Sequence, residues 1–158
     1  MNVVVNTSPL VALDRIGRLD LLHKLFGEVI RPQSVVDELQ AGRIAHGGSS
    51  ELYNAVWLKT AADPPEMILR KELGAGETAV IALASRIQAE LVILDDLAAR
   101  NVAVEIGLKV TGTLGILLAA HQKGILNDIE ATVSALSESG FRMSDNMIRS
   151  ILNRPQRP

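Results

Sequence analysis

The stretch that decides the fold is Glu90-Leu-Val-Ile-Leu-Asp-Asp-Leu97, in which four apolar residues run directly into two adjacent carboxylates, Asp95 and Asp96. A short, unbroken run of Leu, Val and Ile is typical of a strand that is buried on both faces of a parallel sheet. Ligands of open α/β sheets bind just beyond the carboxyl ends of such strands. Asp95 and Asp96 therefore stand where a site would be built. The structural alternative is that one of them caps the helix beginning near Leu97 while the other interacts with its dipole.

Apolar strands and amphipathic helices alternate along the rest of the chain. The pattern predicts strands at 3–5, 28–30, 91–94 and 108–111, and helices at about 10–16, 19–26, 32–40, 77–88, 97–106 and 113–123. Pro9 suits the first turn of the first helix, with Thr7 or Ser8 as its cap. Residues 41–50 and 61–65 are expected to be irregular, and 67–73 helical. This alternation indicates βαβ units and a parallel sheet with right-handed crossovers, and therefore an α/β fold.

The chain length of 158 residues is that of one domain with a substantial core. Two more helices are predicted at about 127–139 and 144–153. We therefore expect a single domain over 1–158, with a helical C-terminal extension at about 127–153. The sequence contains no internal repeat or low-complexity segment.

Composition restricts the chemistry. The chain has no Cys, which excludes disulfides and thiolate metal sites, and its three His are too far apart in sequence for zinc-ligand spacing. A bound metal would be a hard cation held by oxygen. The net charge of −2 provides no overall attraction to nucleic acid, so RNA binding would need a local basic patch. No signal peptide or membrane-length apolar run is visible, and we expect a cytoplasmic protein without a membrane partner.

Glu77 is a carboxylate within the apolar stripe of its predicted helix. At about 100° per residue, Val80, Ile81, Leu83, Ala84 and Ile87 surround it, whereas Thr78, Ala82 and Arg86 lie on the far side. An isolated buried carboxylate is destabilising unless a cation or donors compensate it. The alternative is that Glu77 lies in an exposed first turn, where the helix dipole favours it.

Other oxygen-bearing side chains could join these acids at one sheet edge. Asn6 follows the first strand, and Glu38 lies at the boundary of the apolar face of its helix, whereas Asp37 points toward solvent. Asn6 could equally serve a turn or cap, and Thr113 an N-cap. If Asn6, Glu38, Glu77 and the aspartate pair converge, they would suit Mg²⁺ or Mn²⁺. Such sites activate water for phosphodiester cleavage.

The sequence resembles the PIN-domain superfamily, in its VapC-like branch of toxin–antitoxin ribonucleases, from Val3 to about Gly124. The stretches that carry the resemblance are Val-Val-Asn6-Thr-Ser-Pro-Leu, Val-Val-Asp-Glu38-Leu, Gly-Glu77-Thr-Ala-Val-Ile-Ala-Leu-Ala and Val-Ile-Leu-Asp95-Asp96. Two later stretches, Val-Thr111-Gly-Thr113-Leu-Gly and Gly-Phe141-Arg-Met-Ser, match a less-studied subgroup. Each stretch is short, and their order and spacing make the match specific.

The resemblance implies a three-layer α/β/α sandwich around a central parallel sheet and an endoribonuclease that depends on Mg²⁺ or Mn²⁺. It also implies a homodimer held by a small antitoxin protein. Glu38 matches the second acid of the family, Glu77 the third and Asp96 the fourth, with Asp95 as an adjacent candidate. The first acid, normally an Asp, is replaced by Asn6. An amide oxygen can still bind a metal but carries no charge, so we expect weaker metal binding and low or lost activity.

The leading hypothesis is therefore hydrolysis of RNA by a metal-activated water, with Glu38, Glu77, Asp96 and Asn6 as metal ligands and Asp95 beside them. Thr7, Ser8 and Thr113 would position the phosphate. Contacts to the RNA backbone would come from Arg100, or from Arg43 and His46 in the glycine-rich segment.

Two other classes remain open from sequence. One is a catalytically silent PIN-like module that binds RNA or protein, which the replacement of the first acid by Asn6 favours. The other is a phosphatase or response-regulator-like domain. The sequence disfavours this last class because Asn6 stands where a phosphoryl-accepting Asp would be expected, and no suitable Lys follows the third strand-like run.

Overall fold

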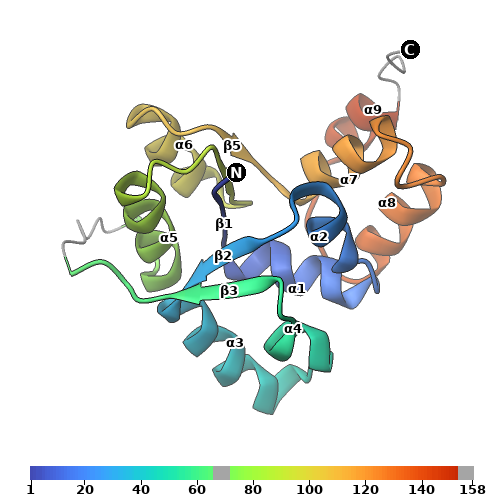
Figure 1. The fold of residues 1–158 in the computed structure, drawn as a ribbon. Helices are drawn as coiled ribbons and strands as arrows, with labels where there is room; N and C mark the ends of the chain where they lie inside the picture. The colour runs from blue at the N-terminus through green and yellow to red at the C-terminus, as the bar shows by residue number, and fades with distance from the viewer. Residues whose placement is uncertain (66–71, 153–158) are drawn as a thin grey trace.

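Five parallel strands form the centre of the protein in the computed structural model, which describes residues 1–65 and 72–152 (Figure 1). The strands are β1 (Val3–Val5), β2 (Val29–Pro32), β3 (Leu58–Ala61), β4 (Leu91–Ile93) and β5 (Val110–Thr111). In the described residues they form one sheet in the order β3-β2-β1-β4-β5. The middle strand, β1, has three valines without exposed surface, as expected for an unbroken apolar run.

The strand order reverses at the middle of this sheet. From β1 the chain proceeds to β2 and β3 on one side and then returns to β4 and β5 on the other. Every strand pair is parallel, so the carboxyl ends share one edge. Val5 pairs with Ile93, which brings Asn6 next to the chain that leaves β4. A crevice at such a reversal is the usual ligand site of open α/β sheets.

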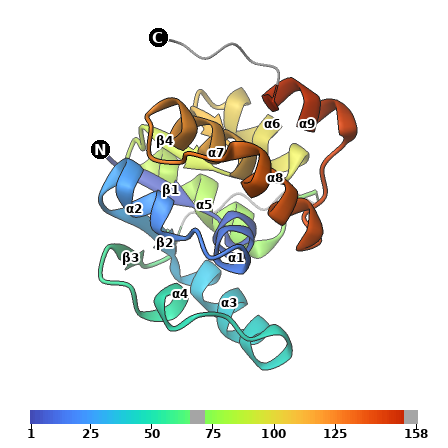
Figure 2. The same cartoon turned by 90° about the vertical axis from the view of Figure 1, so that its right-hand side faces the viewer.

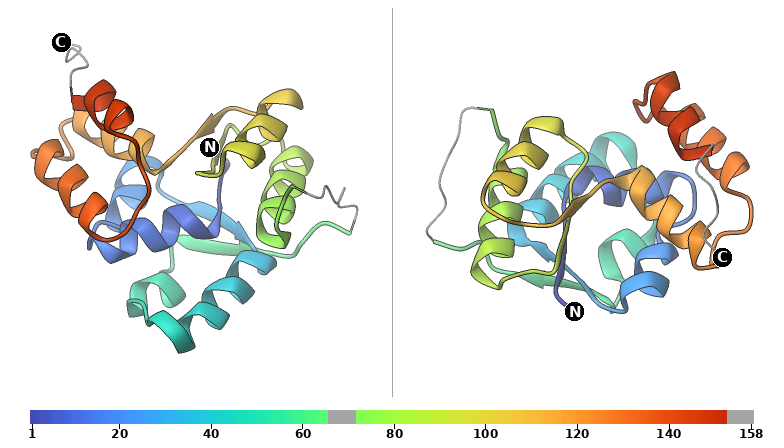
Figure 3. Two further views of the ribbon diagram at one scale, coloured as in Figure 1. Left: turned by 180° about the vertical axis from the view of Figure 1, so that it is seen from behind. Right: turned by 90° about the horizontal axis from the view of Figure 1, so that it is seen from above.

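Helices cover both faces of the sheet. They are α1 (Thr7–Arg15), α2 (Asp20–Phe26), α3 (Gln33–His46), α4 (Ser50–Asn54), α5 (Ala75–Arg86), α6 (Leu97–Glu105), α7 (Thr113–Gln122), α8 (Ile129–Glu138) and α9 (Asp145–Leu152). Helices α5 and α6 lie on one side of the sheet, and α2, α7 and α8 on the other (Figures 1 and 3). The expected three-layer α/β/α sandwich is therefore confirmed. None of the helices in the described ranges has the length and hydrophobicity needed to cross a bilayer.

The C-terminal extension packs on the body of the protein. Helix α8 contacts α7 and α1, and α9 contacts α8 (Figure 2). The residues Ile129, Val133 and Leu136 of α8 are buried, and their spacing places them on one helix face. They belong to the same apolar cluster as the strands, so the extension and the sheet share one core.

Two segments differ from the sequence-based expectation. Residues 41–46 were expected to be irregular, but α3 continues through them and ends at Gly47, which has a φ of 76°. One glycine inside a helix costs only about 1 kcal/mol relative to alanine, so Gly42 does not interrupt it. Strand β3 was not predicted because it is an edge strand in which Leu58 is buried while Lys59 and Thr60 are exposed. Most of the helix expected at 67–73 lies outside the described residues.

Helix α5 is also more buried than its sequence indicated. Thr78 was placed on the far side from the apolar stripe, yet it is only 3% exposed. The reason is that α5 packs on the sheet and is flanked by α3 and α6. The Thr78 hydroxyl donates a hydrogen bond to the Gly74 carbonyl oxygen at 2.9 Å, which satisfies it inside the protein.

The shared core leads to a prediction about unfolding. Leu136→Ala removes a fully buried side chain and should lower the free energy of unfolding by about 2–5 kcal/mol. Because the core is continuous, urea denaturation should still show a single transition at a lower midpoint. Ser134→Ala, at an exposed position of the same helix, is the control and should change stability by less than about 0.5 kcal/mol. A separate early transition in Leu136→Ala would show that the extension is an independent unit.

Candidate active site

Asn6 lies at the point where β1 ends and α1 begins. Its backbone N–H donates to the Ile93 carbonyl oxygen at 3.1 Å, which attaches it to β4. The helix begins at Thr7, so the N-cap is Asn6 and not Thr7 or Ser8 as predicted, and its side chain makes no capping hydrogen bond. The residue is 6% exposed, and its Oδ1 atom is buried without a hydrogen-bond partner among the described residues. This orphaned oxygen borders a cleft.

Glu77 lies in the first turn of α5 and borders the same cleft. Its Oε2 atom is also buried without a hydrogen-bond partner in the described part of the chain. Burial raises the pKa of Glu77, and the negative charge of Asp96 raises it further, with a smaller contribution from Glu38. A hydrogen bond from the Gly74 backbone opposes this effect. The carboxylates of Glu77 and Asp96 therefore lie close together, and no Lys or Arg of the described residues forms an ion pair with either one.

The aspartate pair divides two roles between its members. Asp96 is the N-cap of α6, and its Oδ2 accepts a hydrogen bond from the Ala99 N–H at 3.0 Å. Asp95 accepts hydrogen bonds from the Thr113 N–H and hydroxyl, both at 2.7 Å, and from the Ser8 hydroxyl at 3.1 Å. Asp95 therefore joins the end of β4 to the starts of α7 and α1. Its geometry makes it a structural junction, whereas Asp96 faces Glu77.

Glu38 is held on the other side of Glu77. Its carboxylate accepts hydrogen bonds from the Thr7 hydroxyl at 2.7 Å and from the Gly76 N–H at 2.9 Å. A Cβ atom on Gly76 would lie 2.5 Å from a Glu38 oxygen, so only glycine permits this approach. Glu38 thereby attaches α3 to the start of α5 and positions Glu77. It borders a second cavity, not the cleft of Asn6 and Asp96.

The residues that were predicted to position the phosphate have different environments in the structure. Thr113 is fully buried and donates to Asp95, so it cannot touch a substrate, and its assignment was wrong. The hydroxyls of Thr7 and Ser8 are engaged with Glu38 and Asp95. Arg100, which was predicted to contact the RNA backbone, borders the cleft.

The expected RNA contact at Arg43 is also changed by the fold. The guanidinium of Arg43 lies over the Tyr53 ring, 4.5 Å from its centroid, and Arg43 does not border the cleft that holds Asn6 and Asp96. The side chain of His46 lies outside the described part of the structure.

The donor set fits a hard cation, with fewer acids than expected. Among the described residues, no three His, Cys, Asp or Glu side chains are gathered closely enough to hold a metal ion. The three-acid ligand set of Glu38, Glu77 and Asp96 is thus not assembled. What the site offers is Glu77, Asp96 and the orphaned Asn6 oxygen. Mg²⁺ commonly binds through one or two carboxylates, with water and substrate phosphate oxygens completing its shell.

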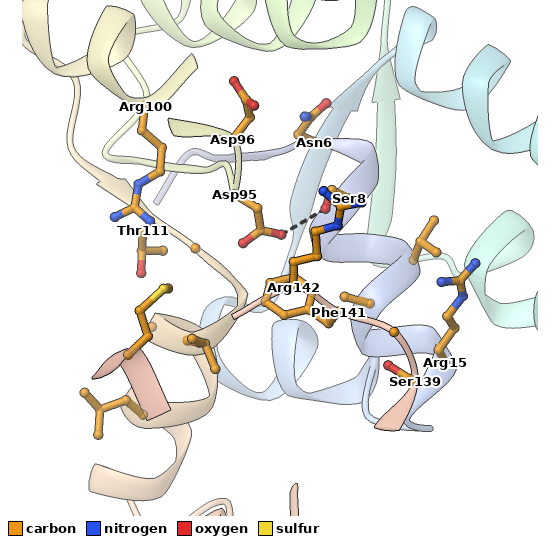
Figure 4. Close-up of a pocket in the computed structure, with 18 of the residues that line it drawn as sticks. Asn6, Ser8, Arg15, Asp95, Asp96, Arg100, Thr111, Ser139, Phe141 and Arg142 are labelled. Carbon is orange, nitrogen blue, oxygen red and sulfur yellow. Dashed lines mark hydrogen bonds between the residues drawn. The ribbon is translucent and has the colours of Figure 1, made fainter. Parts of the chain in front are cut away.

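The cleft at this edge has a volume of about 960 Å³ and runs from the acids to the C-terminal extension (Figure 4). Arg15, Arg100 and Arg142 line it together with the acids. Sequence reasoning identified Arg100 alone among these cations. The only signal for Arg142 was its place in the Gly-Phe141-Arg-Met-Ser stretch, and nothing in the sequence indicated Arg15, which reaches the cleft from the last turn of α1.

Comparison with known proteins agrees with this fold. A family model described as a PIN domain matches residues 2–157, and the chain therefore belongs to the PIN-domain family. The fold is similar to that of a PilT N-terminus domain protein from the hyperthermophilic archaeon Sulfolobus solfataricus, with a TM-score of 0.59 and 19% sequence identity. The match covers 76% of this chain and 93% of that one. No curated protein matches the sequence significantly. PIN domains are generally nucleases that use divalent metal ions.

The position of Glu77 generates a prediction about pH. Its pKa is raised on folding, so between the ordinary and the raised value the folded state binds more proton than the unfolded one, and stability falls as pH rises through this window. At neutral pH, Glu77→Gln should therefore increase the Tm of the metal-free protein by about 2 °C. The increase should vanish in acid, below the ordinary Glu pKa of about 4.3.

The same variant tests metal binding by differential scanning fluorimetry. Mn²⁺ should raise the Tm of the unmodified protein but not that of Glu77→Gln, since ligands that bind the folded state stabilise it. Glu90→Gln, at an exposed position, is the matched control and should respond like the unmodified protein. An identical response of all three to Mn²⁺ would remove Glu77 from the ligand set.

Proposed function

We propose that this protein is a divalent-metal-dependent endoribonuclease that hydrolyses RNA phosphodiester bonds in the cleft at the carboxyl edge of its sheet. The observation that carries the proposal is the pair of buried, unpartnered oxygens, Asn6 Oδ1 and Glu77 Oε2, in the cleft that Asp96 also borders. Unsatisfied buried polar atoms are rare in native proteins and call for an explanation such as an ion. Family membership supports the same reading.

Asn6, Glu77 and Asp96 would hold Mg²⁺ or Mn²⁺. When bound, such an ion neutralises the charge that develops on phosphate oxygens and lowers the pKa of water. The fold brings the carboxylates of Glu77 and Asp96 close together, where they repel each other. A bound divalent cation would offset this repulsion. Glu38 positions Glu77 through Gly76, and Asp95 positions the end of β4 through Thr113 and Ser8.

Direct hydrolysis is the reaction class that the side chains support. The chain has no Cys. Asp95, which accepts the hydrogen bond of the Ser8 hydroxyl, is also engaged by the Thr113 N–H and hydroxyl, so it is a poor base for a serine nucleophile. A water molecule would therefore be the nucleophile.

The biological setting is part of the proposal and is supported by the family resemblance alone. The protein would act in the cytoplasm as the toxin of a toxin–antitoxin pair, as a homodimer held by a small antitoxin protein.

RNA cleavage is the direct test. With Mn²⁺ and a labelled single-stranded RNA, Glu77→Gln should reduce the cleavage rate by roughly 100-fold or more, because even second-shell residues of metal sites contribute 10–100-fold. Asp37→Asn removes a charge of the same sign at an exposed position, where Asp37 contacts Gln33, and should cleave at the unmodified rate. Equal rates for Glu77→Gln and the unmodified protein would refute the assignment.

A second function is favoured by one observation. Asn6 replaces an acid, and the described residues contain no three-acid metal cluster, as expected for a catalytically silent PIN-like module that binds RNA or protein. Asn6→Asp adds a charge at the rim of the site and distinguishes the two functions. If the protein is an active nuclease, the variant should change an existing Mn²⁺-dependent rate. If cleavage is found only in Asn6→Asp, the natural protein is the silent module.

A further inference from the structure

The C-terminal extension supplies the wall of the cleft that faces the acidic sheet edge. Within the segment 139–144, which follows α8, Phe141 and Met143 are half-buried and pack on the apolar core. Arg142, between them, is exposed and borders the cleft. This alternation is that of an extended segment with one face inward. Two apolar anchors thus hold the backbone on either side of Arg142 in place, and its side chain points into the cleft (Figure 4).

The arginines that line the cleft form no ion pair within residues 1–65 and 72–152. Both ion pairs found in the described ranges involve Asp20, which binds Arg18 and Lys24. Arg15, Arg100 and Arg142 make none, although the cleft they line also contains Glu77, Asp95 and Asp96. The carboxylates are instead occupied by backbone and hydroxyl donors or by one another. The cleft therefore contains both acids and guanidinium groups, and at Gly112 the Asp95 carboxylate and the Arg100 guanidinium approach the same point of the backbone.

Acids together with unpaired guanidinium groups match the chemistry of a phosphodiester chain. A scissile phosphate would lie with the cation at Glu77 and Asp96, and the phosphates next to it would contact the guanidinium groups. Arginine suits this role because its planar fork binds phosphate through two parallel hydrogen bonds. The protein has a net charge of −2, so long-range attraction cannot supply RNA affinity, and local contacts of this kind must.

The lining of the cleft suits a single strand. Apolar as well as charged side chains line its volume of about 960 Å³. The extension also presents Phe141 and Met147 to the cleft, with Asn146 beside them. Apolar side chains can stack against or cover an unpaired base, and an amide can donate to and accept from its edge.

Building on the proposed ribonuclease function, we propose that the C-terminal extension is the substrate-binding wall of the cleft. Arg142, together with Arg15 and Arg100, binds phosphates that flank the scissile one in a single-stranded RNA. The adjacent base lies against Phe141 and Met147.

Binding measured without catalysis tests this assignment. Fluorescence anisotropy with a fluorescein-labelled single-stranded RNA decamer in EDTA reports affinity alone. Arg142→Ala should weaken binding about tenfold, the loss expected for one charge-assisted hydrogen-bonded contact. The slope of log K against log salt concentration should decrease by about 0.7, the value for one phosphate contact to a single strand. Arg142→Lys should retain the slope and recover part of the affinity.

Arg149→Ala is the matched control, because Arg149 is an exposed arginine of α9 that does not border the cleft. It should bind within about twofold of the unmodified protein. Circular dichroism establishes that the variants are folded. Equal affinity and equal slopes for Arg142→Ala and Arg149→Ala would overturn the assignment, even if Mn²⁺-dependent cleavage is observed. RNA binding that depends on Arg142 without any cleavage would refute the nuclease and support the binding wall. Absence of RNA binding by the unmodified protein would overturn both.

Discussion

The parallel pairing of β1 with β4 is the constraint on which the functional geometry depends. It is the pairing across which the strand order reverses, and its register aligns Val5 with Ile93. Asn6 and the aspartate pair leave the sheet side by side as a direct consequence. Asp95 then secures this arrangement through its three hydrogen bonds to Ser8 and Thr113. Adjacent aspartates thus serve different purposes, one holding helices and the other facing the cleft.

The negative charges of Glu77 and Asp96 repel each other across the site. Glu77 is half-buried in the first turn of α5, where its pKa is raised by burial and by the charge of Asp96. The Ala99 N–H bond to Asp96 and a Gly74 backbone hydrogen bond to Glu77 compensate this pair in part, but Glu77 Oε2 has no hydrogen-bond partner among the described residues. Local conflicts of this kind are expected where a protein binds something that the fold itself lacks. In the proposed function, the repulsion between Glu77 and Asp96 would favour the binding of a divalent cation, and Asn6 would contribute an oxygen without charge.

The wall of the cleft that faces the sheet edge is formed by the C-terminal extension and is built separately from that edge. Helix α8 is anchored by buried residues in the central core, and Phe141 and Met143 continue this anchoring beyond it. Between these anchors the extension is free to present polar side chains to the cleft. Variation in this short segment would alter substrate binding without disturbing the acidic edge, because the two walls are built by different parts of the chain.

The sequence by itself determined the layer architecture and most of the strands and helices. Unbroken apolar runs such as 91–94 specify buried parallel strands, and the position of Glu77 within an apolar stripe identified it as unusual. Edge strand β3 and the continuation of α3 through Gly42 were not predictable, because long-range packing outweighs local preference there. Only the tertiary structure decided that Thr113 is buried and that Glu38 supports Glu77 from a separate cavity. It also decided that Arg15 and Arg142 line the same cleft. Hydrogen-bond partners and charge neighbours depend on how distant segments approach one another, and periodicity along a single chain carries no information about that approach.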